Sequence, residues 1–227
     1  KFQNAGASAT IVDLRYNKGG TMDCVQLLAS ILVQTSRLNS TMASLIYNDK
    51  NTAKNTTLNF ETGILGSGVN LDQNQLIFIT SGTTAGAAEM LSICLYNKNN
   101  GPSIVMIGSK SKGQNVATER FVSPTHPWAI NPVVCTVYNA EKDNFLLAPT
   151  TDFTISETTI DGNTNYSQFL PFGDPKERLL NIALQTLEGT YPKTKGIAAT
   201  RSTGSFKIEK SVTSPASRHF KGGLRIK

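Results

Sequence analysis

The sequence predicts an α/β protein, because two strand–turn–helix units follow one another and a further strand comes directly after the second. Residues 9–16 (ATIVDLRY) and 76–80 (LIFIT) are short, apolar, β-branched runs that are typical of buried strands. Each run ends in a turn of small residues and is followed by apolar residues at helical spacing. Strands that alternate with helices in this way usually form a parallel sheet covered by helices.

The first unit joins the strand 9–16 to a helix over residues 21–38 through the turn Asn17-Lys18-Gly19-Gly20. Thr21 is the expected N-cap, and Asp23 lies in the first helical turn, where a negative charge suits the helix dipole. The apolar face of this helix is predicted from residues at helical spacing, which are Cys24, Leu27, Leu28, Ile31 and Leu32.

The second unit runs from the strand 76–80 into a helix over residues 85–96. The turn NKNNGP then leads to a strand over residues 103–108. Between the two units, we expect strands at residues 42–47 and 57–62, with a polar loop between them.

From residue 116 the pattern indicates a smaller and more irregular β region. Its expected strands are residues 117–122, 133–139, 144–147 and 152–155. A last helix is predicted over residues 174–187, with Asp174 as N-cap, Pro175 at the first helical position and Gly189 closing it. The expected core domain therefore covers residues 1–188.

The remaining residues, 189–227, are expected to form a basic extended tail. Nine of the 22 basic residues and one of the 16 acidic residues lie after Thr190, which leaves 13 basic and 15 acidic residues, a net charge of −2, before it. The overall charge of +6 therefore belongs to the tail. A nucleic-acid-binding protein would more often carry a basic face on its folded domain, so no nucleic-acid partner is expected.

No metal, cofactor or membrane segment is predicted. His126 and His219 are the only histidines, and Cys24, Cys94 and Cys135 lie far apart among apolar residues, so we expect three buried thiols and no zinc site. No apolar run approaches the ~20 residues that a membrane-spanning helix needs. Since Lys1 opens directly into polar sequence, the chain is expected to be a trimmed product.

Four segments taken together resemble the C-terminal processing (tail-specific) serine peptidases. IVDLRYNKGG is similar to their strand and Gly-Gly turn, and LIFITSGTTAGAAEML resembles the strand, TASASE turn and helix that carry the nucleophile. IVMIGSKSKGQNVATERF resembles the next strand, with a GxxTxGKG-like turn that carries the catalytic Lys, and the β region and last helix are also similar. The resemblance covers roughly residues 9–188.

This resemblance implies a Clp-protease/crotonase-like core with a Ser–Lys dyad and an oxyanion hole of backbone N–H groups. Matched residue by residue, it puts Gly86 at the nucleophile position and Gln114 at the base position. Gly has no side chain and a Gln amide is not a useful base, so the dyad is missing. Gly19, Gly20 and the Ala87 N–H match the oxyanion hole.

Another pair could replace the dyad, and we consider Ser81 or Thr84 as nucleophile with Lys110 or Lys112 as base. The plainer interpretation is that Ser81 and Thr84 hydrogen-bond the backbone of their own turn, and that both lysines are solvated. Glu89 matches a family Glu and is expected to be a structural hydrogen-bonding residue. Asp13 and Arg15 are expected to form a structural ion pair or to have a role at the strand edge.

Three functions therefore remain open. The first is a non-catalytic relative of these peptidases that binds extended peptides or protein C-termini by strand addition. The second is an active serine-type peptidase with a displaced nucleophile, and the third is a structural or assembly module. The resemblance alone implies an extracytoplasmic location, in the periplasm or on the surface of a bacterium, and the oligomeric state is left open.

Overall fold

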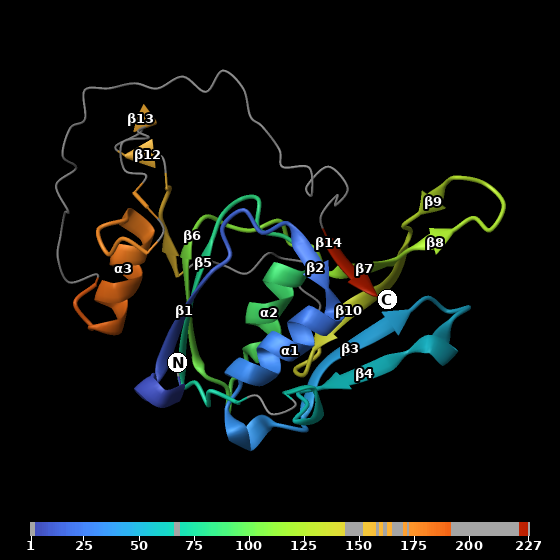
Figure 1. Ribbon diagram of the computed structural model, residues 1–227, viewed down its shortest axis with the longest axis horizontal. Coiled ribbons are helices and arrows are strands. Elements are labelled where there is room, and N and C mark those ends of the chain that lie inside the picture. Colours follow the sequence, from blue (N-terminus) through green and yellow to red (C-terminus); the bar gives the residue numbers. More distant parts are fainter. Residues whose placement is uncertain are drawn as a thin grey trace.

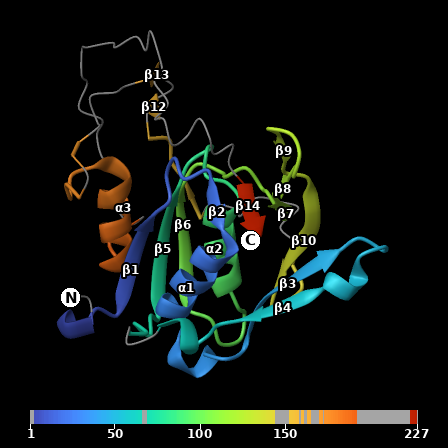
Figure 2. The same ribbon diagram turned by 45° about the vertical axis from the view of Figure 1, so that its right-hand side comes forward.

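A computed structural model of the chain describes residues 3–65, 69–143, 152–157, 159–160, 163–164, 170–171, 173–191 and 223–226. Two sheets enclose the helices α1 (Met22–Leu32) and α2 (Ala87–Leu95), and a third helix, α3 (Arg178–Leu187), covers the outer face of the first sheet (Figures 1 and 2). This layered arrangement confirms the predicted α/β class.

The first sheet is parallel and buried on both faces. Its strands, in spatial order, are β1 (Ala9–Asp13), β5 (Gln75–Thr80), β6 (Ser103–Gly108) and β11 (Phe153–Thr154). In β5, Leu76 and Phe78 belong to the cluster around α1 and α2, whereas Ile77 and Ile79 pack with α3. The first four residues of LIFIT are apolar because successive side chains enter two different cores.

The second sheet is mixed and closes the core on the far side of α1 and α2. Its strands, in spatial order, are β2 (Gly19–Thr21), β14 (Gly223–Ile226), β7 (Val116–Glu119), β10 (Val133–Asn139), β3 (Thr41–Tyr47) and β4 (Thr56–Asn59). In the run β7, β10, β3 and β4, each strand is antiparallel to the next. The strand β14 runs parallel to both of its neighbours, β2 and β7.

Smaller elements complete the described part of the chain. Two two-stranded ribbons pair β8 (Phe121–Val122) with β9 (Ala129–Ile130) and β12 (Thr159–Ile160) with β13 (Asn163–Thr164). Single turns of 3₁₀ helix occur at Gln3–Ala5, Thr35–Arg37, Thr52–Lys54 and Gly63–Leu65. Within the described residues, no helix has the length and apolar character needed to cross a membrane.

Most predicted strands are confirmed, with shifts of a few residues, but two predictions need correction. The run 117–122 is two strands, because β7 ends at Glu119 and β8 begins at Phe121. The helix predicted for 21–38 ends at Leu32, and a 3₁₀ turn follows. This turn buries Arg37, whose guanidinium donates to the Leu95 carbonyl oxygen at 2.6 Å, a tertiary contact that no helical periodicity encodes. The strand predicted at 144–147 lies outside the described residues.

The buried face of α1 also differs from the prediction. Its buried residues are Met22, Val25, Ala29, Ser30 and Leu32. Leu27 and Leu28 are 40% and 38% exposed, and Cys24 is exposed. The apolar residues of this helix outnumber the positions that face α2 and β2, so periodicity alone could not select the buried subset. The expectation of three buried thiols is therefore wrong for Cys24.

The thiol environments predict that native protein reacts at Cys24 alone. Burial raises the pKa of Cys94 to about 12 and that of Cys135 to about 11, so both stay protonated near pH 8. Ellman's reagent at pH 8 is expected to titrate one thiol in folded protein and three after denaturation. Cys24→Ser should remove the native reaction, and rapid reaction of a second thiol would contradict the assignment.

The start of α3 is a further correction. Its N-cap is Glu177, whose carboxylate accepts from the N–H groups of Leu179 and Leu180 at 3.3 and 2.9 Å. Asp174 instead accepts from the Lys176 N–H in the preceding turn. The end is as predicted, since Gly189 follows the helix with φ 67°.

The strand β14 lies in the stretch expected to form a tail. Of residues 189–227, the structure describes 189–191 and 223–226, and the latter lie between β2 and β7. Leu224 is 2% exposed and belongs to the main core. These four residues therefore belong to the core sheet, whereas the division of the chain at residue 188 stays a prediction.

Candidate functional site

Three loops meet at one edge of the first sheet, where β1, β5 and β6 end. They are the Gly-Gly loop (residues 14–20), the Gly86 loop (residues 81–86) and the Gln114 loop (residues 109–115). Because the three strands are parallel, their carboxyl ends lie at the same edge, which is where open α/β sheets place their ligands. All of the site residues predicted from the sequence lie in these loops, in β2 or at the start of α2.

The Gly-Gly loop and the Gly86 loop are held together by hydrogen bonds. The Thr84 hydroxyl donates to the Leu14 carbonyl oxygen at 2.8 Å, and the Ala85 N–H donates to the Asn17 carbonyl oxygen at 3.0 Å. The N–H of Tyr16 donates to the Ser81 hydroxyl oxygen at 3.2 Å. These contacts fix the Gly-Gly loop against the start of α2.

Glu89 joins the Gly86 loop to the Gln114 loop. Its side chain is buried, and one carboxylate oxygen accepts from the N–H of Gly86 at 2.8 Å and from that of Gln114 at 3.0 Å. The other oxygen accepts from the Gly113 N–H at 2.5 Å. Glu89 is thus a structural hydrogen-bonding residue, and it holds the two positions assigned to the dyad beside each other.

Neither dyad position carries a reactive side chain. Gly86 is buried and adopts φ 58° and ψ −116° as the N-cap of α2, a conformation that side-chain-bearing residues rarely adopt. Gln114 is exposed, and its amide is neutral and cannot act as a base near neutral pH. Glu89 thus joins the backbones at the two positions that the resemblance matches to the dyad, and neither position carries a Ser or Lys side chain.

The three groups predicted for an oxyanion hole differ in availability. The Gly19 N–H already donates to the Asn17 side-chain oxygen at 3.0 Å. Gly20 lies against the start of α2, since a Cβ at Gly20 would come within 3.3 Å of the Ala87 Cβ. The Ala87 N–H, at the first position of α2, has no acceptor among the described residues. It therefore remains free to donate to an oxygen of a ligand.

The hydroxyls considered as substitute nucleophiles are already engaged. Thr84 is fully buried, and its hydroxyl oxygen also accepts from the Ser81 N–H at 3.0 Å. The Ser81 hydroxyl lies 2.9 Å from that of Thr83. Both arrangements are hydrogen bonds within the turn or to the adjacent strand.

The two lysines of the Gln114 loop are exposed. Among the described residues, no hydrogen bond joins Lys110 or Lys112 to the hydroxyl of Ser81 or Thr84. The backbone N–H of Lys112 donates to the Thr84 carbonyl oxygen at 3.0 Å, so the backbone of this residue links the Gln114 loop to the Gly86 loop. A lysine base would need a desolvated position beside its nucleophile, which neither lysine has.

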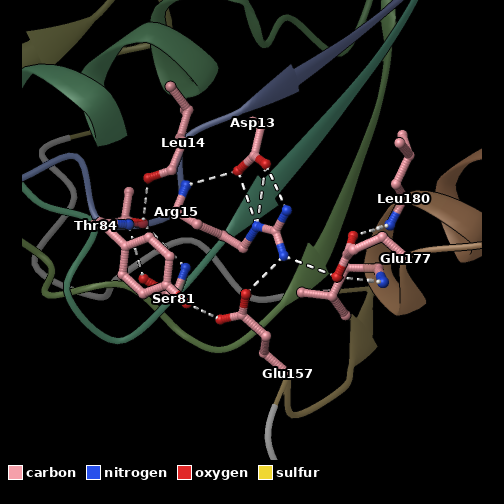
Figure 3. Close-up of polar contacts among 10 residues, drawn as sticks. Asp13, Leu14, Arg15, Ser81, Thr84, Glu157, Glu177 and Leu180 are labelled. Carbon is pink, nitrogen blue, oxygen red and sulfur yellow. Dashed lines mark hydrogen bonds and ion pairs between the residues drawn. The ribbon is translucent and has the colours of Figure 1, made fainter. Parts of the chain in front are cut away.

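An ion-pair cluster forms around the buried side chain of Arg15, at the start of the Gly-Gly loop (Figure 3). The side chain of Arg15 is 6% exposed and contacts three carboxylates, with N–O distances of 2.6 Å to Asp13, 2.7 Å to Glu157 and 3.0 Å to Glu177. The expected Asp13–Arg15 ion pair is therefore confirmed. Glu177 is also the N-cap of α3, so Arg15 links β1 to α3 and to the segment after β11.

Burial and the neighbouring carboxylates have opposite effects on the pKa of Arg15 and act in the same direction on the pKa of Tyr16. Burial by itself lowers the pKa of Arg15, but the hydrogen bond to Asp13 and the nearby charges of Glu177 and Glu157 raise it overall. Burial raises the pKa of Tyr16, and the hydrogen bond from its hydroxyl to Glu157 raises it further. Arg15 therefore stays charged and Tyr16 stays protonated around neutral pH.

Tyr16 makes the stability depend on pH in the alkaline range. Its pKa is raised in the folded state, so the unfolded chain releases this proton first, near the ordinary value of about 10. The contribution is thus complete below pH ~10 and is lost as the pH rises above that value. Urea unfolding of the wild type and Tyr16→Phe should show a difference in unfolding free energy that shrinks between pH 9 and 11. A constant difference would contradict the contact with Glu157.

Several residues of the site could not be recognised from sequence. Glu157 and Glu177 lie 142 and 162 positions from Arg15, and no local pattern points to such partners. The sequence identified Asn17 only as a turn residue, although its side-chain oxygen accepts a hydrogen bond from the Gly19 N–H. Among the described residues, no group of three His, Cys, Asp or Glu side chains is arranged to hold a metal ion.

The comparisons with known proteins agree with this geometry. The sequence profile of Peptidase family S41 matches residues 1–143. The chain therefore belongs to peptidase family S41, which confirms the family predicted from the four motifs. A comparison with curated proteins finds no match.

Two solved structures show the same fold, and a third is similar to a lesser extent. An S41 protease from Bacteroides fragilis NCTC 9343 is 39% identical, with a TM-score of 0.74 over 83% of this chain and 46% of that one. A lipoprotein from Streptococcus agalactiae is 21% identical, with a TM-score of 0.50 over 68% and 54% of the two chains. The photosystem II D1 C-terminal processing protease is 13% identical, with a TM-score of 0.49 over 67% and 36%. The chain thus spans less than half the length of the Bacteroides protein.

Proposed function

We propose that this chain is a non-catalytic member of peptidase family S41 that binds extended peptides or protein C-termini at the three loops. One observation carries the proposal: Glu89 holds the backbones of Gly86 and Gln114 beside each other, and neither residue has the side chain of the Ser or Lys that the family resemblance puts there. The framework of the site is kept and the reacting groups are replaced.

The start of α2 suits an acceptor oxygen of a peptide. The Ala87 N–H is free among the described residues, and the positive end of the α2 dipole lies there. Gly86 adds no side chain in front of it. A carbonyl oxygen or a terminal carboxylate of a bound peptide would accept from Ala87 without being attacked.

The alternative of a displaced nucleophile has less support from the contacts. Ser81 and Thr84 use their hydroxyls within the protein, and Lys110 and Lys112 are exposed. The third alternative, a structural module without peptide binding, would leave the free Ala87 N–H without a role.

The decisive experiment restores the missing pair with Gly86→Ser and Gln114→Lys. The parent, the double variant and the size-matched control Gly86→Ala with Gln114→Met are assayed against unstructured peptides, with fluorescence anisotropy for binding and mass spectrometry for cleavage. We expect the parent to bind without cleaving and the double variant to cleave. Both single variants should remain inactive, since nucleophile and base act as a unit.

Other outcomes would reject the proposal in distinguishable ways. Cleavage by the parent that survives repurification and disappears in Ser81→Ala or Thr84→Val would establish a displaced nucleophile. Absence of both binding and cleavage in all proteins would favour the structural module.

We also propose an extracytoplasmic location, which rests on the family resemblance. Fractionation of the producing cell, with detection of the native protein by antibody, should find it outside the cytoplasm. Recovery of the protein in the cytoplasmic fraction alone would reject this location.

A further inference from the structure

The strand β14 occupies an unusual place, between two elements of the candidate site. On one side it pairs with β2, with Gly223 opposite Gly19, Leu224 opposite Gly20 and Arg225 opposite Thr21. On the other side it pairs with β7, with Leu224 opposite Ala117. We call this place, between Gly19–Thr21 and Val116–Glu119, the central strand position.

The central strand position is continuous with the loops that hold the dyad positions. β2 contains Gly19 and Gly20, and Gly20 lies against Ala87 of α2. β7 begins two residues after Gln114. A strand in this position therefore touches the Gly-Gly side and the Gln114 side of the site at the same time, and α2 also contacts β14.

β2 depends on the occupant of this position. β2 is the outermost strand of its sheet, and β14 is its only strand partner in the described structure. Without an occupant, the backbone of Gly19–Thr21 and the facing edge of β7 would both lose their ladder partners. The strand in the central strand position thus holds Gly19–Thr21 in place by pairing with its backbone.

The contacts of β14 are those of a peptide bound by strand addition. Leu224 is 2% exposed and Ile226 packs against the same core, so alternate side chains enter the protein. The Thr118 hydroxyl donates to the Leu224 carbonyl oxygen at 3.1 Å. Main-chain pairing on both edges with pockets for alternate side chains is the mode by which sheets recognise extended peptides.

We infer that the central strand position is a peptide-binding site whose ligand in this structure is the chain's own Gly223–Ile226 segment. Its ligand class is an extended peptide, parallel to β2 and β7, with apolar side chains two residues apart in the pattern Gly-Leu-Arg-Ile. A peptide of this pattern supplied by another molecule competes for the position with the internal segment. The inference deepens the proposed function, on which it rests, by naming a ligand for that site.

The test uses the full chain with Leu224→Asp, which removes the apolar anchor of the internal segment. A fluorescent peptide with the sequence of residues 219–227 (HFKGGLRIK) is added, and binding is followed by anisotropy. We expect affinity about tenfold or more above that of the wild type, because in the wild type the position is free only when β14 leaves it. The control Leu27→Asp changes an exposed leucine and should behave as the wild type.

Every outcome decides the inference. If Leu224→Asp is folded by circular dichroism and does not bind the peptide, or if the wild type binds equally well, the inference fails. If Leu224→Asp is unfolded without the peptide, the inference requires that the added peptide restores a cooperative thermal transition. If the peptide does not restore this transition, the inference is overturned. A peptide that carries Asp in place of the leucine should fail in both formats.

The two proposals fail separately. Anisotropy with the parent protein and unstructured peptides tests binding at the three loops, and absence of binding there rejects the proposed function. The Leu224→Asp protein reports on the central strand position, and its failure leaves β14 as a permanent strand of the core while foreign-peptide binding can still be observed.

Discussion

Replacing Glu89 by Gln is expected to lower the free energy of unfolding by about 2–4 kcal/mol. The buried carboxylate accepts three backbone N–H groups, from Gly86, Gly113 and Gln114. An amide of the same shape has one acceptor oxygen and places its own N–H donors against at least one of these groups. A buried N–H group that loses its acceptor stays without a hydrogen bond in the folded state, and its full desolvation cost lowers the free energy of unfolding.

Urea unfolding measures this loss, and Glu61→Gln provides the matched control on an exposed glutamate. The control should change stability by less than about 0.5 kcal/mol. The same substitution should weaken peptide binding, because the Gly86 and Gln114 loops lose their common acceptor. A loss below about 1 kcal/mol for Glu89→Gln would mean that the carboxylate does not hold the loops together.

Replacing Arg15 by Met is expected to cost about 3–5 kcal/mol of unfolding free energy. The substitution keeps an apolar stem but removes the cation that faces Asp13, Glu157 and Glu177. Glu157 and Glu177 are 13% and 7% exposed in their side chains, so water replaces the lost partner poorly. Removing one partner of a buried pair leaves an uncompensated charge, which is the costly case.

Three further variants separate charge from shape in this cluster. Arg15→Lys should recover only part of the loss, because an ammonium lacks the planar fork that reaches several carboxylates. Adding Glu157→Gln and Glu177→Gln to Arg15→Met should restore stability in part, which a thermodynamic cycle measures. Arg120→Met, at an exposed arginine, should be nearly neutral. Equal losses for Arg120→Met and Arg15→Met would rule out the cluster as the cause.

Local sequence patterns were sufficient to predict the two strand–turn–helix units of the fold. The first four residues of LIFIT are apolar, and the structure buries them from both sides, which a single alternating pattern would not require. The glycines and small residues after each strand marked the three loops, because few other residues make such turns. The expectation that the dyad is missing also came from the sequence, since the absence of a side chain at Gly86 needs no structure to be recognised.

The buried face of α1 and the N-cap of α3 could be determined only from the tertiary structure. The apolar residues of α1 offered more than one possible face, and only packing on α2 and β2 left Leu27, Leu28 and Cys24 exposed. The sequence pattern predicted Asp174 as the N-cap of α3, whereas the structure places Glu177 there, where it also contacts Arg15.

The sequence by itself determined the class of fold and the family, because strand and turn propensities and residue identity are local properties. The tertiary structure alone decided that Glu89 joins the two dyad positions, that Arg15 collects carboxylates from distant segments, and that residues 223–226 enter the sheet beside Gly19 and Gly20. These contacts join residues 25 to more than 200 positions apart, and they form only when hydrophobic burial brings the strands and helices together.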